Sequence, residues 1–286
     1  MKNSKNGLYF GTAGIPNSSP KLDTFSGIKK LKELNLDVME LEFVHGVKIS
    51  TTTANKINTF SKQYNIFLSV HAPYYINLNS LDPEKIEASI NRIVKTCEIA
   101  SYCAAKDIVI HPGYYHNMDK LTAYNNIKNN LKKVLELISD YDVILRIETM
   151  GKISQFGTLE EVLNLSQDLG PKVLPCLDFA HIYARSLGKI NSYNDFYKIF
   201  EDVKHKLGKD ALNNIHIHIS GIKYSDKGEV HHLNLKESQF NYIDFVKVLK
   251  DLNIKGLIII ESPNLEEDAT LLKNLYYSNI SLSNIP

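Results

Sequence analysis

Several residues that can bind metal ions stand at the ends of apolar runs in this sequence. Five runs end in a histidine or an acidic residue; in chain order these residues are His71, His111, Glu148, Asp178 and Glu261. Another run carries His216 and His218 near its end. Imidazole and carboxylate side chains are common ligands of zinc and similar divalent metals. A fold that brings the ends of these runs together would therefore form a centre for several metal ions.

Eight apolar runs recur along the chain and alternate with segments of helical periodicity. The runs cover residues 8–12, 38–43, 67–71, 107–111, 143–148, 173–178, 214–219 and 256–261. The helical segments cover residues 24–34, 53–63, 83–104, 121–137, 159–168, 193–207, 242–252 and 265–277. This alternation, without a Pro- or Gly-rich linker, predicts a single (β/α)8 TIM barrel over residues 1–286, with loose ends at 1–6 and 280–286. The carboxyl ends of all strands in such a barrel meet on one face, where the active site lies. A doubly wound sheet is the alternative, but it would not explain why nearly every strand ends in a candidate ligand.

Further candidate ligands lie in the two longest connections after predicted strands. Asp178 and His181 form an Asp-x-x-His turn, whose spacing lets both side chains point into the barrel mouth. Glu229, His231 and His232 lie in the polar connection 220–240. His216 and His218 share one face of their strand, so one could bind a metal while the other fills a layer of the barrel or supports a ligand.

Each of these residues also has an ordinary structural explanation. A histidine at a strand end is often a hydrogen-bonded core residue, and Asp178 could simply cap a helix. Glu148 could be neutralised by Arg146 or by a lysine, because a buried carboxylate is costly unless it is paired or metal-bound. The metal interpretation depends on how many such residues share one level of the barrel.

The composition excludes several other classes of protein. The formal net charge of +1 excludes a strongly basic coat, so nucleic-acid binding would depend on local cations, of which Lys152, Arg185 and Lys223 lie nearest the predicted strand ends. Three cysteines without a CxxC pair are typical of a reducing compartment. No run approaches the roughly 18 apolar residues of a membrane helix, and the polar start is no signal peptide. We therefore expect a cytoplasmic protein without a membrane partner.

The sequence resembles the endonuclease IV family of apurinic/apyrimidinic (AP) endonucleases, within the xylose-isomerase-like barrels. Seven short family motifs have counterparts in the same order, at residues 71–78, 111–113, 147–151, 178–181, 218–221, 229–231 and 261–262. The match runs through the whole chain. It also departs from the family pattern: Ser220 and Gly221 replace an Asn-Asp pair, and Glu229 replaces an aspartate. These departures indicate a divergent branch.

The resemblance implies a cluster of three zinc ions, with Mn²⁺ as the alternative metal. The first ion would be held by His71, His111 and Glu148. The second would be held by Glu148, Asp178, His218 and Glu261. The third would be held by His181, Glu229 and either His231 or His232. With four carboxylates, three such ions would keep a net charge of about +2, which suits a phosphodiester substrate.

The resemblance also predicts the activity. It implies a metal-dependent hydrolase that cleaves DNA 5′ to an abasic site in base excision repair, with Glu148 and Glu261 as the catalytic carboxylates and Tyr74 near the scissile phosphate. The expected partner is duplex DNA with an abasic site, and no obligate protein partner is evident.

The alternative enzyme is a sugar isomerase or epimerase, which needs one or two divalent ions and a strand-end set of Glu, His and Asp that this chain also contains. A third ion would favour the nuclease. A binding protein with a vestigial cluster is a further alternative, but no ligand is clearly lost.

Overall fold

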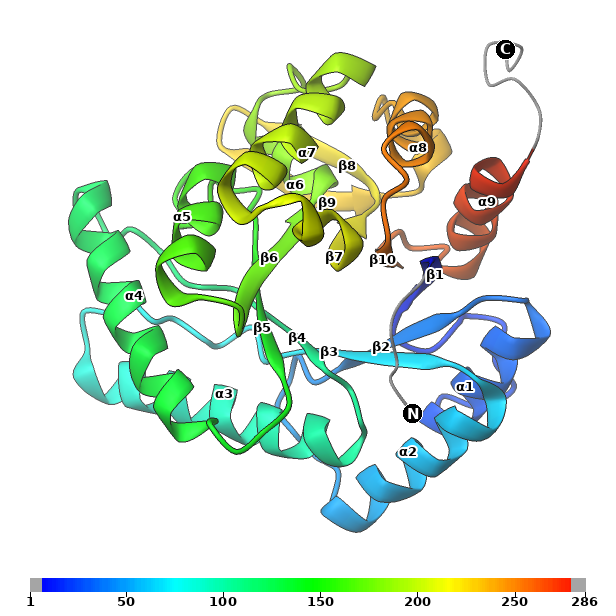
Figure 1. The fold of residues 1–286 in the computed structure, drawn as a ribbon, viewed down its shortest axis with the longest axis horizontal. Helices are drawn as coiled ribbons and strands as arrows, with labels where there is room; N and C mark the ends of the chain where they lie inside the picture. The colour runs from blue at the N-terminus through cyan, green and yellow to red at the C-terminus, as the bar shows by residue number, and fades with distance from the viewer. Residues whose placement is uncertain (1–6, 279–286) are drawn as a thin grey trace.

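A closed barrel of eight parallel strands lies at the centre of the computed structural model, which describes residues 7–278 (Figure 1). The barrel strands are β1 (Leu8–Ala13), β2 (Val38–Glu42), β3 (Phe67–His71), β4 (Asp107–Ile110), β5 (Ile144–Glu148), β6 (Val173–Asp178), β7 (Ile215–Ile219) and β10 (Gly256–Ile260). They follow one another around the barrel in chain order, and β10 closes onto β1. Each lies within one residue of a predicted apolar run, so the predicted barrel is confirmed. The loose ends predicted at 1–6 and 280–286 lie outside the described residues.

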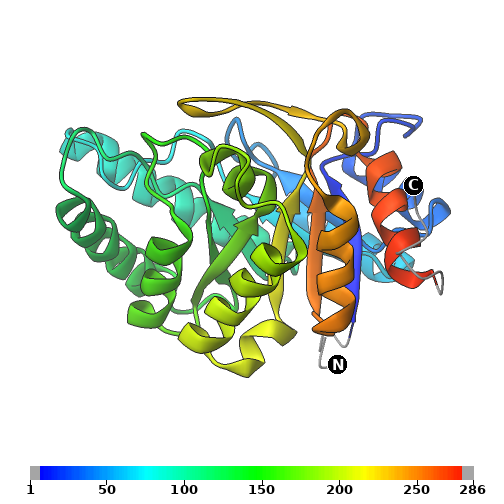
Figure 2. The same ribbon diagram turned by 90° about the horizontal axis from the view of Figure 1, so that it is seen from above.

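Helices surround the barrel and cover the outer faces of its strands (Figures 1 and 2). They are α1 (Thr24–Glu33), α2 (Thr51–Tyr64), α3 (Pro83–Tyr102), α4 (Lys120–Leu137), α5 (Leu159–Leu169), α7 (Tyr193–Leu207), α8 (Tyr242–Asp251) and α9 (Glu266–Tyr277). Local sequence fixes where they begin: the Asp82 side chain accepts a hydrogen bond from the backbone of Glu84, with Pro83 in the first turn. In α5, Thr158 and Glu161 form a capping box.

Two elements occupy connections in which the sequence indicated no regular structure. A short helix, α6 (Phe179–Arg185), follows β6 directly, and an antiparallel hairpin of β8 (Gly221–Ser225) and β9 (Gly228–Leu233) follows β7. Figure 2 shows the hairpin across the end of the barrel at which the strands finish. Seven helical residues are too few for a clear period, and the hairpin strands are short and polar, so neither gives a strong sequence signal.

The barrel interior contains a polar group near the amino ends of β4 and β7. Buried Arg146 donates from Nε to Asp107 at 2.7 Å and from Nη2 to Asn214 at 2.9 Å. Arg146 is therefore paired with Asp107, and the alternative in which it neutralises Glu148 does not hold. Val38, Leu257 and Ile259 form a separate apolar cluster.

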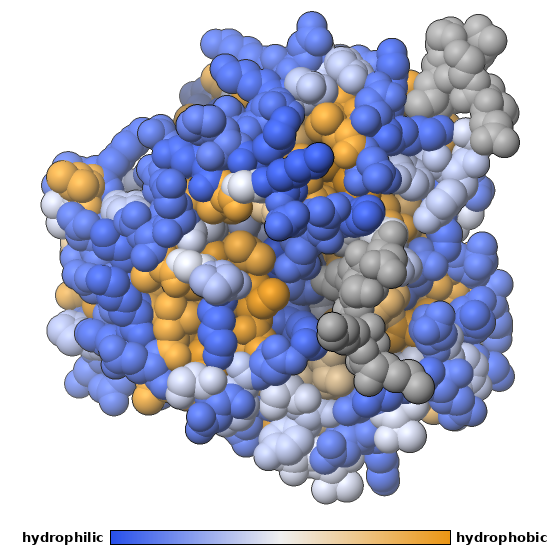
Figure 3. All heavy atoms as spheres, viewed as in Figure 1, coloured by the Kyte–Doolittle hydropathy of each residue, from blue (hydrophilic) through white to orange (hydrophobic). Residues whose placement is uncertain are grey.

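The two ends of the barrel differ in role. Figure 3 shows the end opposite the hairpin, which is mostly hydrophilic, with hydrophobic atoms reaching the surface inside the ring of helices. The candidate ligands lie at the other end. Among residues 7–278, no helix is long and apolar enough to cross a membrane.

Candidate metal centre

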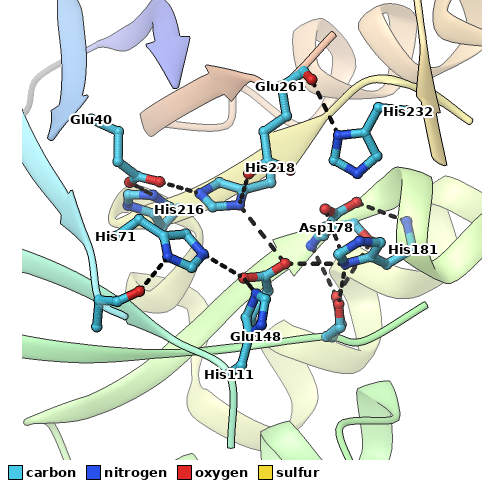
Figure 4. A network of polar contacts seen from close by, with 12 residues as sticks. Glu40, His71, His111, Glu148, Asp178, His181, His216, His218, His232 and Glu261 are labelled. Atoms are coloured by element: carbon cyan, nitrogen blue, oxygen red, sulfur yellow. Dashed lines mark hydrogen bonds and ion pairs between the residues drawn. The ribbon is translucent and has the colours of Figure 1, made fainter. Parts of the chain in front are cut away.

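The carboxylate of Glu148 lies at the centre of the side chains gathered at the carboxyl ends of the strands (Figure 4). Its Oε2 atom is 3.4 Å from Nε2 of His71 and 3.0 Å from Nε2 of His111. Its Oε1 atom is 3.0 Å from Nδ1 of His181 and 4.0 Å from Nδ1 of His218. These four imidazoles come from β3, α6, β7 and the residue after β4. Glu148 can therefore be shared by more than one ion.

His71, His111 and Glu148 form the first group of ligand atoms, which lie within 4.8 Å of one another. The ring of Tyr74 stacks on His111, with centroids 5.2 Å apart and an interplanar angle of 24°. Tyr74 is 49% exposed, so it stands at the rim of this group where a substrate could reach it.

Glu148, Asp178 and His218 form the second group, with ligand atoms within the same 4.8 Å limit. Oε1 of Glu261 is 3.2 Å from Nδ1 of His218 and so lies beside this group. Asp178 also caps α6, because its Oδ1 atom accepts from the backbone of His181 at 2.7 Å. Its Oδ2 atom makes no hydrogen bond among the described residues. The cap and a ligand role are thus compatible, since each uses a different oxygen.

His181, Glu229 and His232 form the third group. Nε2 of His181 is 3.3 Å from Oε2 of Glu229, and Nδ1 of His232 is 3.1 Å from the backbone oxygen of Glu261. His231 is exposed and takes no part in this group. Of the two histidines that the sequence left open, the structure places His232 at the site.

A β-bulge explains why His232 shares a face with Glu229. Tyr224 pairs with Glu229 but Lys223 pairs with His231, so Val230 is an extra residue in β9. Side chains alternate along a strand, and one inserted residue shifts every later side chain to the other face. Glu229 and His232 therefore point the same way, although three residues separate them.

Two glycines let the hairpin approach the loop after β5. A Cβ atom on Gly151 would lie 2.7 Å from Cβ of Glu229 and 2.9 Å from Cδ2 of His181. A Cβ on Gly228 would lie 2.1 Å from the backbone oxygen of Gly151. The backbone of Glu229 donates to that oxygen at 3.2 Å. The third group thus requires a close contact that only glycine allows.

Burial and charge oppose each other in this cluster. Burial alone would raise the pKa of Glu148, but the imidazoles of His111, His181 and His71 lower it well below its usual value. Burial alone would lower the pKa of His71, yet its contact with Glu148 raises it to about 9. Burial raises the pKa of Asp178 to about 6. The negative charges of Glu261 and Glu148 add to this rise, whereas the charge of His181 opposes it. In the metal-free protein, protons on imidazoles supply positive charge that bound metal would otherwise supply.

The donor set fits divalent transition metals. Oδ2 of Asp178 and Nδ1 of His218 are buried without a hydrogen bond among residues 7–278. Such atoms are costly, and coordination to a metal ion would satisfy both. The mixture of imidazole and carboxylate suits zinc or manganese. The residues present therefore fit the three-ion cluster that the resemblance implies.

Glu40 on β2 is a buried carboxylate beneath the cluster that no strand-end pattern indicates. Its Oε1 atom is 2.9 Å from Nε2 of His218, and its Oε2 atom is 3.1 Å from Nε2 of His216. Strand β2 is not a neighbour of β7, so these contacts cross the barrel interior. Cys176, His216 and His218 form a further possible ligand group and are all buried, but Glu40 already contacts both imidazoles.

Glu40 reduces the net charge expected for the loaded centre from about +2 to about +1. The available signal was an acidic residue inside an apolar run, rather than at its end.

The cations near the site are fewer than the sequence indicated. Nη1 of Arg185 donates to the backbone oxygens of Met150, Lys152 and Gln155 at 3.1, 2.7 and 3.0 Å. The expectation that Arg185 is a cation available to a substrate is therefore wrong, because its guanidinium holds the loop after β5. Lys152, which lies within this loop, and Lys223, which lies on β8, are exposed.

The model of one protein family matches most of this chain. The family is described as the xylose isomerase-like TIM barrel, and residues 28–275 match it. The chain belongs to this family. An uncharacterized protein of Methanocaldococcus jannaschii is 49% identical over 271 residues, which cover 94% of this chain and 97% of that protein. A protein of Mycoplasma pneumoniae named probable endonuclease 4 is 29% identical over 216 residues, which cover 72% and 73%.

Solved structures with different names share this fold. A D-tagatose 3-epimerase-like protein matches with a TM-score of 0.70 and 24% identity, over 92% of this chain and 95% of that one. Endonuclease IV from Thermus thermophilus also matches with a TM-score of 0.70, at 17% identity, over 94% and 97%. Equal structural similarity to both leaves the choice of reaction to the site itself.

Proposed function

We propose that this protein is a zinc-dependent phosphodiesterase that incises duplex DNA at abasic sites. The observation that carries the proposal is the third ligand group, in which α6 and the β8–β9 hairpin add His181, Glu229 and His232 to the ligands at the strand ends. Phosphoryl transfer develops charge on the attacking, bridging and leaving oxygens, so several adjacent divalent ions suit it. The similarity to the probable endonuclease 4 of Mycoplasma pneumoniae supports the same reaction.

The residues of the chain would hold the ions, orient the substrate and donate a hydrogen bond to it. Glu148 would help to hold both the first and the second ion, because one of its oxygens faces His111 and the other faces His218. Bound zinc would supply an acidified water and stabilise the leaving oxygen. Burial and the neighbouring Glu261 raise the pKa of Tyr74, so its phenol stays protonated and can donate a hydrogen bond to a phosphate oxygen.

A metal-dependent sugar isomerase or epimerase is the second candidate. Glu148, Asp178, His218 and Glu261 all lie at strand ends, and alone they could hold one ion beside a sugar. The added charge of Glu40 and the engaged guanidinium of Arg185 make the mouth less attractive to a phosphate backbone than a ligand count suggests. These two observations favour an uncharged substrate.

One experiment separates the two candidates. Zinc-loaded protein is incubated with a labelled duplex that carries one tetrahydrofuran abasic analogue, with the intact duplex, and with a set of ketohexoses. We expect incision 5′ to the analogue, none of the intact duplex, loss of activity with a chelator and recovery with zinc. His181→Ala should abolish incision, whereas His231→Ala, which changes an exposed histidine of the same hairpin, should not. Epimerisation of a sugar without incision would establish the second candidate.

A further inference from the structure

We infer that Glu40 is a positioning residue that fixes the tautomer of His218 and turns Nδ1 of that imidazole to the metal centre. The inference rests on the proposed metal centre and adds a residue to it. Within residues 7–278, Glu40 belongs to none of the groups that could hold an ion, and it contacts the proposed ligands through His218.

The two nitrogens of His218 face different partners (Figure 4). Nε2 is 2.9 Å from Oε1 of Glu40, whereas Nδ1 is 3.2 Å from Oε1 of Glu261 and 4.0 Å from Oε1 of Glu148. A neutral imidazole carries one N–H and one lone pair, and an ionised carboxylate can only accept. Nε2 of His218 and Oε1 of Glu40 form a close ion-pair contact, although neither atom makes a hydrogen bond of regular geometry among residues 7–278. A carboxylate at this distance favours a proton on Nε2, which leaves the lone pair of His218 on Nδ1, on the side of Glu148.

Other contacts hold Glu40 in this position. Oγ of Ser69 donates to its Oε2 atom at 2.7 Å, and Nε2 of His216 lies 3.1 Å from the same oxygen. Glu40 is fully buried, and its partners come from β3 and β7. The carboxylate is thus fixed from two sides before any ion binds. Metal-binding histidines commonly use such a partner on the second nitrogen, which sets the tautomer and the ring orientation.

A purely structural role for Glu40 makes a different prediction. If Glu40 only neutralised a doubly protonated His218, both nitrogens would carry a proton and Nδ1 could not bind an ion. Removal of the carboxylate would then destabilise the fold but leave metal affinity unchanged. Metal affinity and the tautomer therefore separate the two roles.

The first test is competition between the protein and a zinc chelator. Glu40→Gln keeps the size of the side chain but removes its charge and offers an N–H to imidazole. We expect the affinity for one ion to fall about 10- to 100-fold, with the others unchanged. Glu267→Gln, which makes the same change at an exposed position on α9, is the matched control. It should keep wild-type affinity.

The second test observes the imidazole directly. Side-chain ¹⁵N spectra of the zinc-loaded protein should show His218 protonated at Nε2 and metal-bound at Nδ1, and Glu40→Gln should weaken the Nδ1–metal signature. Glu40→Asp, which restores a carboxylate one methylene shorter, should recover part of the affinity and serves if Glu40→Gln does not fold. Normal zinc affinity in folded Glu40→Gln, or a proton on Nδ1 in the wild type, overturns this inference alone. A wild-type protein that binds no zinc overturns the proposed function and this inference with it.

Discussion

His231 and His232 are adjacent in the sequence, but their side chains lie on opposite faces of β9. Adjacent residues of a strand alternate between its two faces, and the bulge at Val230 is the reason that His232, rather than His231, shares the face of Glu229. His232 then faces His181, with ring centroids 5.8 Å apart, while His231 pairs across the hairpin with Lys223. The two residues have the same chemistry and nearly the same place in the chain, so they form a matched pair for testing the third ligand group.

We expect His232→Ala to lose one zinc ion per chain and most of the incision activity. His231→Ala should retain both, because its side chain is exposed and away from the other ligands. Elemental analysis after gel filtration measures the ion count, and incision of the abasic-site duplex measures activity. The opposite result would mean that the hairpin register differs in solution and that His231 is the ligand.

Gly151→Ala should displace the hairpin without any change in a ligand. The new methyl group would meet Glu229 and His181 at less than 3 Å, so the hairpin must move away and the third ion should be lost. Overpacking of this kind costs about 1–3 kcal/mol of unfolding free energy. Gly7→Ala is the control, since its methyl group would meet only the Tyr9 ring, at 3.8 Å or more. Denaturant unfolding and zinc content measure both effects, and full zinc content in folded Gly151→Ala would contradict the steric argument.

The sequence predicted the barrel because eight apolar runs alternate with helical segments, and no tertiary detail is needed to read that pattern. It also located the ligand candidates at strand ends, since all parallel strands of a barrel finish on one face. His71, His111, Glu148, Asp178 and Glu261 each follow from this rule, and the structure brings them together.

What the sequence could not supply depends on local geometry. His232 rather than His231 faces the site because of a bulge in β9. The bulge is a one-residue shift in strand pairing, which the amino-acid composition does not reveal. Glu40 lies inside a run rather than at its end, and its partner His216 is 176 residues away. The sequence indicated a free cation at Arg185, but its guanidinium donates hydrogen bonds to backbone oxygens of the loop after β5. Each of these depends on contacts between distant segments.

Glu261→Gln should reduce turnover strongly while the fold is retained. The change removes a charge beside Nδ1 of His218, but the preceding strand residues Ile258 and Ile260 keep their buried positions. Glu267→Gln, an exposed change on α9, is the control. Single-turnover incision at saturating protein measures the chemical step. Activity within about tenfold of wild type, or roughly 1.4 kcal/mol of barrier, would show that Glu261 has only a structural role.

The stability of the metal-free protein should fall as pH rises from about 6.5 to about 9. Contact with Glu148 raises the pKa of His71 to about 9 in the folded state, whereas an unperturbed histidine has a pKa of 6.5. A group whose pKa is raised on folding contributes stability that is complete below its unfolded pKa and is lost as pH passes its folded pKa.

Zinc should remove this fall in stability, because it replaces the proton on His71. Thermal unfolding with chelator and with zinc measures the difference. His71→Gln should reduce the fall and His205→Gln, at an exposed site, should not; a fall that is equal in both variants would assign it to other groups.

Binding to abasic-site DNA should depend only weakly on salt. Lys152 and Lys223 are exposed cations near the mouth, whereas Arg185 is held by backbone oxygens, so few phosphates can be neutralised by side chains. Each neutralised phosphate contributes about −0.9 to the slope of log affinity against log salt, so Lys152→Gln and Lys223→Gln should each make the slope shallower by about one. Lys62→Gln, on an exposed lysine near the end of α2, at the opposite end of the barrel, is the control and should leave the slope unchanged. Fluorescence anisotropy with a catalytically inactive Glu261→Gln protein measures the slopes.

The loss of affinity on changing either lysine should be the same for abasic and intact duplexes, because phosphate contacts carry no sequence or damage information. The preference for the abasic site should persist, since it would come from the metal centre and the barrel mouth. A steep slope that all three substitutions reduce equally would instead show that DNA binds through diffuse charge over the whole surface, away from this site.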